Sequence, residues 1–325
     1  MKSIHSLFIL LGAGFSVAGS IMLFNSSELK KMDDNPSVVP NAVQSSFSFN
    51  TPVWNIHTLN FAGEKVPTDD PEVIERIDRE VVFNTFRTSY SILIYKRAAR
   101  WFPVIEPILK SQDIPDDFKY LCITESELTN AVSPAGASGF WQFMKTTAPS
   151  YGLEVNDEVD ERYDVEKATY AACKYFKDAY KKFGSWTLVA ASYNMGMGGV
   201  QNKINEQKVN SYYDLYLNTE THRYVARILA FKLMFENPSK FGYHIKNNDL
   251  YPVLPYKEIE VTNSIPDLVA FAQLHNISYK TLKLWNPWLR KNSLTNTKRK
   301  SYKIRIPNSV NYEKEQSKIN MYYAQ

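Results

Sequence analysis

Apolar residues recur at helical spacing through most of the chain beyond residue 71. The clearest example is 164–184, DVEKATYAACKYFKDAYKKFG, in which apolar residues lie three or four positions apart. Asp164 is the type of residue that accepts hydrogen bonds at the start of a helix, and Gly184 is the type that ends one. The pattern therefore predicts a long amphipathic helix across this stretch.

The same periodicity predicts further helices, with proline marking several boundaries. Within residues 88–112 a break is expected at Pro103 or Pro107, because proline lacks the backbone N–H that a helix needs. Pro115, followed by two aspartates, is typical of a first helical turn and predicts a helix over IPDDFKYLCITES. SWTLVAASYN and ETHRYVARILAFKLMF predict two more. We therefore expect one all-α domain over residues 71–245.

Short strands enter the pattern after about residue 245. KEIEVTN and SYKIRIP are typical of strands, and the sequence between them predicts two short helices around HNIS. The order strand, helix, helix, strand predicts a small separate α+β module over residues 246–325. Basic residues cluster from Lys280 to Arg305, which favours a solvated face over binding of an anionic polymer. The predicted fold class is therefore mainly α, with a small α+β module at the C-terminal side.

The N-terminal residues have a different character. An almost unbroken apolar run follows Lys2 and extends from Leu7 to Phe24, which is typical of a secretory signal or an uncleaved anchor over residues 1–24. We expect an exported protein, with membrane association through this segment left open. Residues 25–70 are rich in Ser, Asn, Pro and Asp and have little periodicity, so they are predicted to be a linker.

Composition narrows the class of function only a little. Apolar residues make up 44% and charged residues 22% of the 325 positions, as in folded proteins. A net charge of +4 is too small to favour nucleic-acid binding. The cysteines and histidines lack metal-ligand spacing, so no metal is expected. The sequence gives no sign of an organic cofactor either, and none is expected. Cys122 and Cys173 could pair in an oxidising compartment or serve as small core residues, and both readings stay open.

Two glutamates lie close together in ITESELTN, residues 123–130, and raise the question of a catalytic pair. On a helix, Glu125 shares a face with Phe118 and Leu121. Glu127 lies roughly 200° around the axis, so the two carboxyls cannot converge on one atom and a single acid remains. Desolvation at an apolar face and the negative end of the helix dipole would both raise the pKa of Glu125, as a general acid requires. An ordinary surface glutamate at a helix end also fits this spacing.

Three sequence blocks occur in order within residues 95–235. The first is ESELTNAVSPAGASGFWQFMKTTAPSYGL, the second AASYNMGMGGV and the third TETHRYVARILA. Together they resemble the catalytic signatures of the lytic transglycosylases of the goose-type-lysozyme-like fold. The preceding FPVIEPILKSQDIPDDFKYL resembles a membrane-bound murein branch of that family. Three ordered blocks are a more specific signal than any one of them alone.

The resemblance assigns expected roles to particular residues. It implies that Glu125 is the catalytic acid and then the base. The substrate-binding residues that it implies are Ser133 and Gln142 in the first block, Tyr193 and Asn194 in the second, and Glu220 and Tyr224 in the third. We expect the Tyr193 hydroxyl near Glu125. We also expect Asn194 to cap the helix before it, and Glu220 either to contact substrate or only to cap the helix that begins at Thr221.

The reaction that the resemblance implies is non-hydrolytic cleavage of peptidoglycan glycan strands. Glu125 would protonate the oxygen of the β-1,4 bond between N-acetylmuramic acid and N-acetylglucosamine. It would then take the proton of the muramic acid C6 hydroxyl, which closes onto C1 to give a 1,6-anhydro end. Hydrolysis would need a second carboxyl across the bond, for which Asp157, Asp160 and Asp164 are candidates. A muramidase and a non-catalytic peptidoglycan-binding protein are the alternatives, and export would place any of them in the periplasm or cell envelope.

The C-terminal module resembles the LysM fold, which grips N-acetylglucosamine chains. NISYKTLKLWNPWL followed by YKIRIP carries this likeness. The usual Gly-Asp before the first helix is replaced by TNSIPDL, so the resemblance implies a degenerate glycan-binding module.

Overall fold

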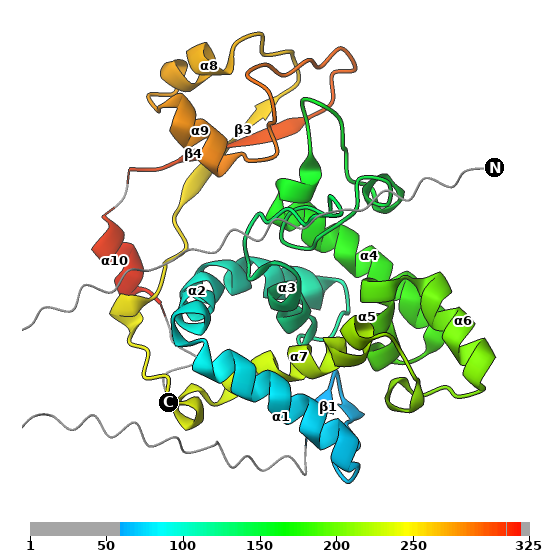
Figure 1. The fold of residues 1–325 in the computed structure, drawn as a ribbon. Helices are drawn as coiled ribbons and strands as arrows, with labels where there is room; N and C mark the ends of the chain where they lie inside the picture. Colours follow the sequence, from blue (N-terminus) through cyan, green and yellow to red (C-terminus); the bar gives the residue numbers. More distant parts are fainter. Residues whose placement is uncertain (1–58, 310, 320–325) are drawn as a thin grey trace, which may run out of the picture. The chain divides into compact units, whose positions relative to one another are not determined.

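The computed structural model describes residues 59–309 and 311–319, and most of them are helical (Figure 1). A two-stranded antiparallel hairpin, β1 (Asn60–Phe61) and β2 (Glu64–Lys65), comes first. The helices of the larger domain follow: α1 (Pro71–Phe86), α2 (Thr88–Ser111), α3 (Phe118–Ser126), α4 (Val165–Phe183), α5 (Trp186–Met195), α6 (Met197–Gln207) and α7 (Thr219–Glu236). The mainly α fold class predicted from the sequence is confirmed.

Helix α3 lies inside the larger domain, among the other helices in Figure 1. It packs against α2 and α7. Phe118, Leu121, Cys122 and Ile123 are fully buried and belong to one apolar cluster that takes in the hairpin and all of α1 to α7. Packing on every side therefore fixes where the C-terminal end of α3 lies, and Glu125 stands at that end.

Helix α4 has the boundaries that its capping residues predict. The Asp164 carboxylate accepts hydrogen bonds from the backbone N–H groups of Glu166 and Lys167. Gly184 ends the helix with a left-handed backbone conformation, φ +66°. The helix predicted over residues 164–184 is confirmed. It could be predicted because local chemistry specifies both of its ends.

The expected break at Pro103 or Pro107 is wrong, since α2 runs through both prolines. Each proline removes one hydrogen bond, to the carbonyl four residues earlier. The two prolines are themselves four residues apart and exposed, so they share the solvent face of the helix. The opposite face, with Phe102 and Ile105 buried, stays packed and keeps the helix continuous.

Helix α3 begins later than its sequence suggests, at Phe118 rather than in the aspartate pair. Pro115 and the two aspartates form a tighter turn, whose carbonyls accept from residues three positions on. Asp117 does not cap α3 with its side chain. It instead accepts hydrogen bonds from the Lys232 ammonium at 2.7 Å and the Ala62 backbone N–H at 2.6 Å, which ties the start of α3 to α7 and the hairpin.

The last part of the predicted linker differs from expectation. Residues 59–70 include the hairpin, and Phe61 and Val66 are fully buried in the main cluster. Phe61 packs against Phe118 with 5.4 Å between ring centroids. Helical periodicity could not reveal this segment, because it contributes only a few apolar side chains from a two-residue strand and a turn. The rest of the predicted linker, 25–58, lies outside the described residues.

A small α+β unit follows the helical domain. It consists of β3 (Tyr256–Val261), α8 (Leu268–Leu274), α9 (Tyr279–Trp285) and β4 (Tyr302–Pro307). The two strands pair antiparallel, from Tyr256 opposite Pro307 to Val261 opposite Tyr302. The strand, helix, helix, strand order is as predicted, and the unit has its own apolar cluster. One more short helix, α10 (Tyr312–Ser317), follows it.

No helix among the described residues is both long and apolar enough to span a membrane. The segment 1–24, predicted to be a signal or anchor, lies outside the described residues.

The burial of Phe61 predicts that the hairpin belongs to the folded domain. Replacing Phe61 with Ala should lower the free energy of unfolding by about 3 to 5 kcal/mol, because it removes a buried ring and leaves a cavity beside Phe118. Chemical denaturation followed by circular dichroism measures this change. Phe83→Ala is the matched control, since Phe83 is 53% exposed on α1. Equal effects of the two substitutions would show that the hairpin is not part of the cooperative unit.

Candidate active site

The chain reverses direction immediately after Glu125. Glu127 and Leu128 both have positive φ, 55° and 56°, which ends α3 and starts a loop. Residues 131–143, here called the glycine loop, then fold back against the helix end. The Ser126 hydroxyl donates to the Phe140 carbonyl of this loop at 2.7 Å. The expectation that Glu125 stands near the C-terminus of a helix is met.

The Glu125 carboxyl meets one hydroxyl group directly. Tyr224 of α7 donates a hydrogen bond from its phenol to Glu125 Oε1. Tyr224 is 2% exposed, while Glu125 is partly exposed, so the carboxyl lies at the boundary between core and solvent. The first and third sequence blocks, 99 positions apart at these two residues, therefore meet at one carboxyl group.

The surroundings of Glu125 raise its pKa from the ordinary 4.5 to about 7. Burial is the largest cause, because it disfavours the charged form. The hydrogen bond from Tyr224 acts in the opposite direction, since it stabilises the carboxylate. The negative charge of Glu220 raises the pKa further, and the positive charge of Arg227 lowers it. The result is a carboxyl that holds its proton close to neutral pH.

Tyr193 lies beside Glu125 but its hydroxyl has another partner. The phenol donates to the Trp141 carbonyl at 2.6 Å and so holds the glycine loop against α5. Burial, followed by the negative charge of Glu125, raises the pKa of Tyr193 well above its usual range. The structure thus brings Tyr193 near the carboxyl, as expected, with its hydroxyl turned to the loop backbone.

Ser133 and Gln142 lie on the glycine loop and make hydrogen bonds within it. The Ser133 hydroxyl accepts from the Ala137 backbone N–H at 3.0 Å. The Gln142 amide nitrogen donates to the carbonyls of Ala131 and Gly139, at 3.0 and 2.8 Å. Gln142 also has a positive φ of 49°. In this conformation the two residues shape the loop, and the Gln142 side-chain oxygen has no hydrogen-bond partner among the described residues.

Asn194 and Glu220 form a polar link between α5 and α7. Asn194 donates to Glu220 Oε1 at 3.2 Å and accepts from the Thr221 hydroxyl at 2.7 Å. The expected cap of α5 by Asn194 is wrong, and of the two roles considered for Glu220 the helix cap is wrong. Gly196 caps α5, since its glycine backbone adopts φ 82° without strain, and Asn218 caps α7 by accepting from the Thr221 N–H. Each helix extends one or two residues further than its sequence suggests.

The three aspartates considered as a second carboxyl are engaged elsewhere. Asp160 pairs with Arg162 at 2.7 Å, and Asp164 caps α4. Asp157 is 82% exposed, with Lys291 3.8 Å away. The carboxylate whose charge acts on Glu125 is instead Glu220, which is exposed at the start of α7.

Sequence reasoning missed Arg227. Its positive charge lowers the pKa of Glu125, and its guanidinium Nε lies 3.6 Å from the Glu80 carboxylate of α1. The signal was available, because Arg227 lies three residues after Tyr224 on the same face of a helix. It lies within the third sequence block, TETHRYVARILA, but the resemblance gave a role only to Glu220 and Tyr224 there.

The two cysteines are buried in the helices that surround the site. Cys122 and Cys173 are buried free thiols in α3 and α4, which favours the reading as small core residues. Burial raises the pKa of Cys173 to about 12, so the thiol stays protonated. Within 59–309 and 311–319, no cluster of His, Cys, Asp and Glu could hold a metal ion.

The chain matches two known domain families. Residues 103–215 match the transglycosylase SLT domain, and residues 257–310 match the soluble lytic transglycosylase C-terminal LysM-like domain. The chain therefore carries an SLT domain followed by a LysM-like domain, as the sequence blocks indicated. The SLT match ends before α7, so the contact of Tyr224 with Glu125 is independent support for including that helix in the site.

Curated relatives agree with this assignment. The chain is 27% identical over 275 residues to the membrane-bound lytic murein transglycosylase D of Escherichia coli strain K12, and to the protein of the same name from an O6:H1 strain. The alignment covers 83% of this chain and 57% of each relative, so the chain spans little more than half their length. It is a distant homologue of these proteins.

The raised pKa of Glu125 makes stability depend on pH. The unfolded chain binds the proton with the ordinary pKa and the folded chain with a pKa of about 7, so folding becomes less favourable as pH rises between these values. Glu125→Gln removes this effect while keeping an acceptor for Tyr224. The unfolding free energy of the variant minus that of the parent should be roughly 2 to 3 kcal/mol larger at about pH 8 than at about pH 4.5.

Urea denaturation of both proteins at the two pH values measures this difference. Glu127→Gln is the matched control, because the Glu127 side chain is 42% exposed two positions further along the chain. A constant stability difference between Glu125→Gln and the parent across this range would mean that Glu125 titrates like an exposed glutamate.

Proposed function

We propose that this protein is a peptidoglycan lytic transglycosylase. It cleaves the β-1,4 bond between N-acetylmuramic acid and N-acetylglucosamine without water and leaves 1,6-anhydro ends. The observation that carries the proposal is one partly buried carboxyl, Glu125, whose pKa of about 7 keeps it protonated near neutral pH beside a hydroxyl donor. The SLT domain match and the names of the curated relatives support the same substrate class.

The roles follow from the chemistry of the neighbouring groups. The Glu125 proton passes to the glycosidic oxygen as the bond to C1 breaks, which leaves a carboxylate. That carboxylate then accepts the proton of the C6 hydroxyl, and the oxygen of this hydroxyl forms the new bond to C1. Tyr224 and Arg227 stabilise the charged form between the two transfers, because one donates a hydrogen bond to it and the other is positive. One carboxyl regains its proton by the end of the cycle.

The remaining predicted residues fit substrate positioning. The glycine loop holds the amide nitrogen of Gln142 on two carbonyls. Its side-chain oxygen has no hydrogen-bond partner in the described part of the chain and can accept a hydrogen bond from a sugar. Asn194 and Glu220 lie at the solvent-exposed junction of α5 and α7 and offer further polar groups. We place the protein in the cell envelope, in keeping with the membrane-bound relatives and the apolar N-terminal run.

The defining test is digestion of purified sacculi, followed by mass spectrometry of the released fragments. The parent should release fragments with 1,6-anhydro ends, and Glu125→Gln should lower the rate by about a hundredfold or more, the usual contribution of a general acid. Glu127→Gln should cleave at the parent's rate. Reducing ends in place of anhydro ends would identify a muramidase. Binding to sacculi with no release of fragments would identify a non-catalytic binding protein.

The pH profile gives a second test through Tyr224. Activity should fall as pH rises through about 7, because Glu125 loses the proton that it must donate. The Tyr224 hydrogen bond lowers this pKa, so Tyr224→Phe should move the alkaline limb of the profile to higher pH. Initial rates on sacculi over a series of pH values measure the shift. An unmoved limb, or a shift to lower pH, would contradict the assignment of Glu125 as the titrating acid.

A further inference from the structure

The LysM-like module is joined to the SLT domain by more than the connecting chain. Residues 154–164, here called the docking segment, project from the SLT domain into the module. Val159 of this segment is 2% exposed and belongs to the apolar cluster of the module. Its backbone pairs with Leu289, the Asp160 N–H donates to the Trp288 carbonyl at 2.9 Å, and Arg290 donates to the Glu158 carbonyl at 2.7 Å. The core of the module is thus completed by a residue of the other domain.

Carboxylates of the docking segment bind polar groups of the module. Glu158 accepts from the Ser293 hydroxyl at 2.9 Å and from the Thr295 backbone N–H at 2.8 Å. The backbone hydrogen bond from Thr295 is the largest cause that holds the pKa of Glu158 below its usual range. Glu154 accepts from Lys300 at 2.9 Å and from the Tyr302 hydroxyl at 3.0 Å. These contacts fix the module at several separate points.

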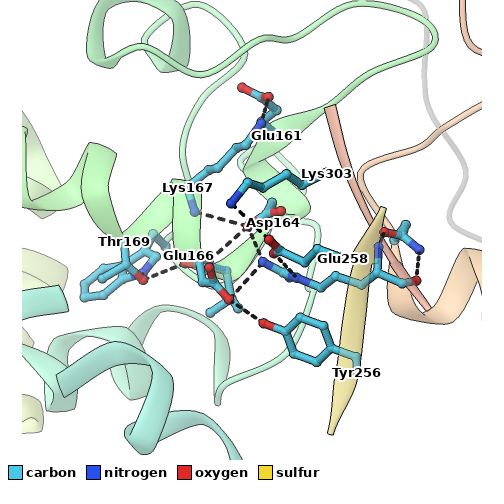
Figure 2. A network of polar contacts seen from close by, with 12 residues as sticks. Glu161, Asp164, Glu166, Lys167, Thr169, Tyr256, Glu258 and Lys303 are labelled. Atoms are coloured by element: carbon cyan, nitrogen blue, oxygen red, sulfur yellow. Dashed lines mark hydrogen bonds and ion pairs between the residues drawn. The ribbon is translucent and has the colours of Figure 1, made fainter. Parts of the chain in front are cut away.

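The first turn of α4 extends the contact (Figure 2). Glu166 accepts a hydrogen bond from the Tyr256 hydroxyl at 3.0 Å. Figure 2 shows this contact beside Asp164 and Glu258. Arg305 of β4 lies among these carboxylates, 2.9 Å from Glu166 and 3.6 Å from Asp164. The side chain of Arg305 is only 13% exposed, so this ion pair is little screened by solvent.

The other side of the docking segment supports the glycine loop through Arg162. This arginine is 6% exposed, and its guanidinium binds both oxygens of Asp160 at 2.9 and 2.7 Å. The remaining nitrogen donates to the carbonyls of Gly136 and Phe143, at 3.0 and 3.1 Å. One side chain therefore ties together both halves of the loop.

Glycine is needed where the loop backbone meets Arg162. A Cβ atom added at Gly139, which has φ +82°, would lie 1.8 Å from the Arg162 carbonyl oxygen. The backbones of the loop and the docking segment are therefore in direct contact at Gly139 and Arg162. Beyond Gly139, the loop reaches the end of α3 through the hydrogen bond from Ser126 to the Phe140 carbonyl.

We infer that Arg162 is a positioning residue for the glycine loop, and that the LysM-like module acts on this loop through the docking segment that the module holds. One continuous series of contacts runs from the module to the docking segment, from its Arg162 to the glycine loop, and from the loop to the end of α3. Loss of the module's contacts with the docking segment therefore loosens the loop that presents Gln142. The functional part of this inference rests on the proposed transglycosylase activity, whereas the mechanical part does not.

Hydrogen exchange of the full chain tests the mechanical part. Arg162→Lys keeps the charge opposite Asp160 but cannot reach both loop carbonyls as well. Its loop amides, such as Ser138 and Gly139, whose N–H groups bond within the loop, should exchange about tenfold faster or more. Arg162→Met should show the same increase with a larger loss of overall stability, because Asp160 is left unpaired. Arg76→Lys is the matched control, since Arg76 is about equally buried and its guanidinium binds the Glu72 carboxylate and the His222 carbonyl, both outside the loop.

A second pair of variants tests the coupling to the module. Glu158→Ala removes acceptors that bind Ser293 and Thr295 without touching the glycine loop, and it should raise exchange in the docking segment and in the loop. Val159→Ala should act in the same direction by loosening the shared core. Faster exchange confined to the module in both variants would overturn the coupling. Parent-like loop exchange in Arg162→Lys would overturn the role of Arg162.

Kinetics on solubilised glycan strands separate positioning from simple loss of structure. A loosened loop should raise KM for Arg162→Lys about tenfold and lower kcat less, because Gln142 contributes binding and Glu125 keeps its own partners. A variant that only unfolds more readily would instead lose active enzyme at unchanged KM, which would contradict a positioning role. If the parent itself releases no fragments, the proposed function fails, and the exchange experiment still decides whether Arg162 holds the loop.

Discussion

The contact between Tyr224 and Glu125 is the interaction on which the candidate site depends. A carboxyl at the edge of a packed core is driven toward its neutral form by desolvation, and a single hydrogen bond together with one positive charge limits that effect. The balance requires that α3 end at the boundary of the core and that α7 pass beside that end. The enclosure of α3 by α2 and α7, and the tie from Asp117 to Lys232, fix both conditions.

Features specified by local chemistry could be predicted from the sequence, and features specified by packing could not. The bounds of α4 follow from Asp164 and Gly184, and the strands of the module follow from their composition. The continuity of α2 depends on which face of the helix carries its two prolines, and that face is known only once the neighbouring helices are placed. The hairpin around Phe61 gives no periodic signal, because a strand of two residues is too short to show one.

The candidate site shows the same division between what the sequence indicates and what only packing determines. Ordered motifs identify Glu125, Gln142, Tyr193 and Tyr224, but motif letters do not say what each side chain contacts. The Tyr193 hydroxyl and the Gln142 amide nitrogen are both directed at backbone carbonyls, so part of the polar character of the motif serves to build the loop. Arg162 belongs to none of the sequence blocks, because what it contacts is a loop 19 to 26 residues earlier in the sequence.

The placement of Glu220 bears on why one carboxyl could suffice. It is exposed, it is held by Asn194, and its negative charge raises the pKa of Glu125. A second carboxylate that acts as a base on water, or as a nucleophile, must stay charged and reach the far side of the bond. A carboxylate whose charge instead helps its neighbour to keep a proton increases the fraction of that neighbour that is protonated at neutral pH, and Arg227 then limits how far the pKa rises. The acidic and basic residues around Glu125 are therefore arranged to hold one transferable proton near neutral pH. The proposed reaction requires this, because the same carboxyl gives one proton to the leaving oxygen and then takes another from the C6 hydroxyl.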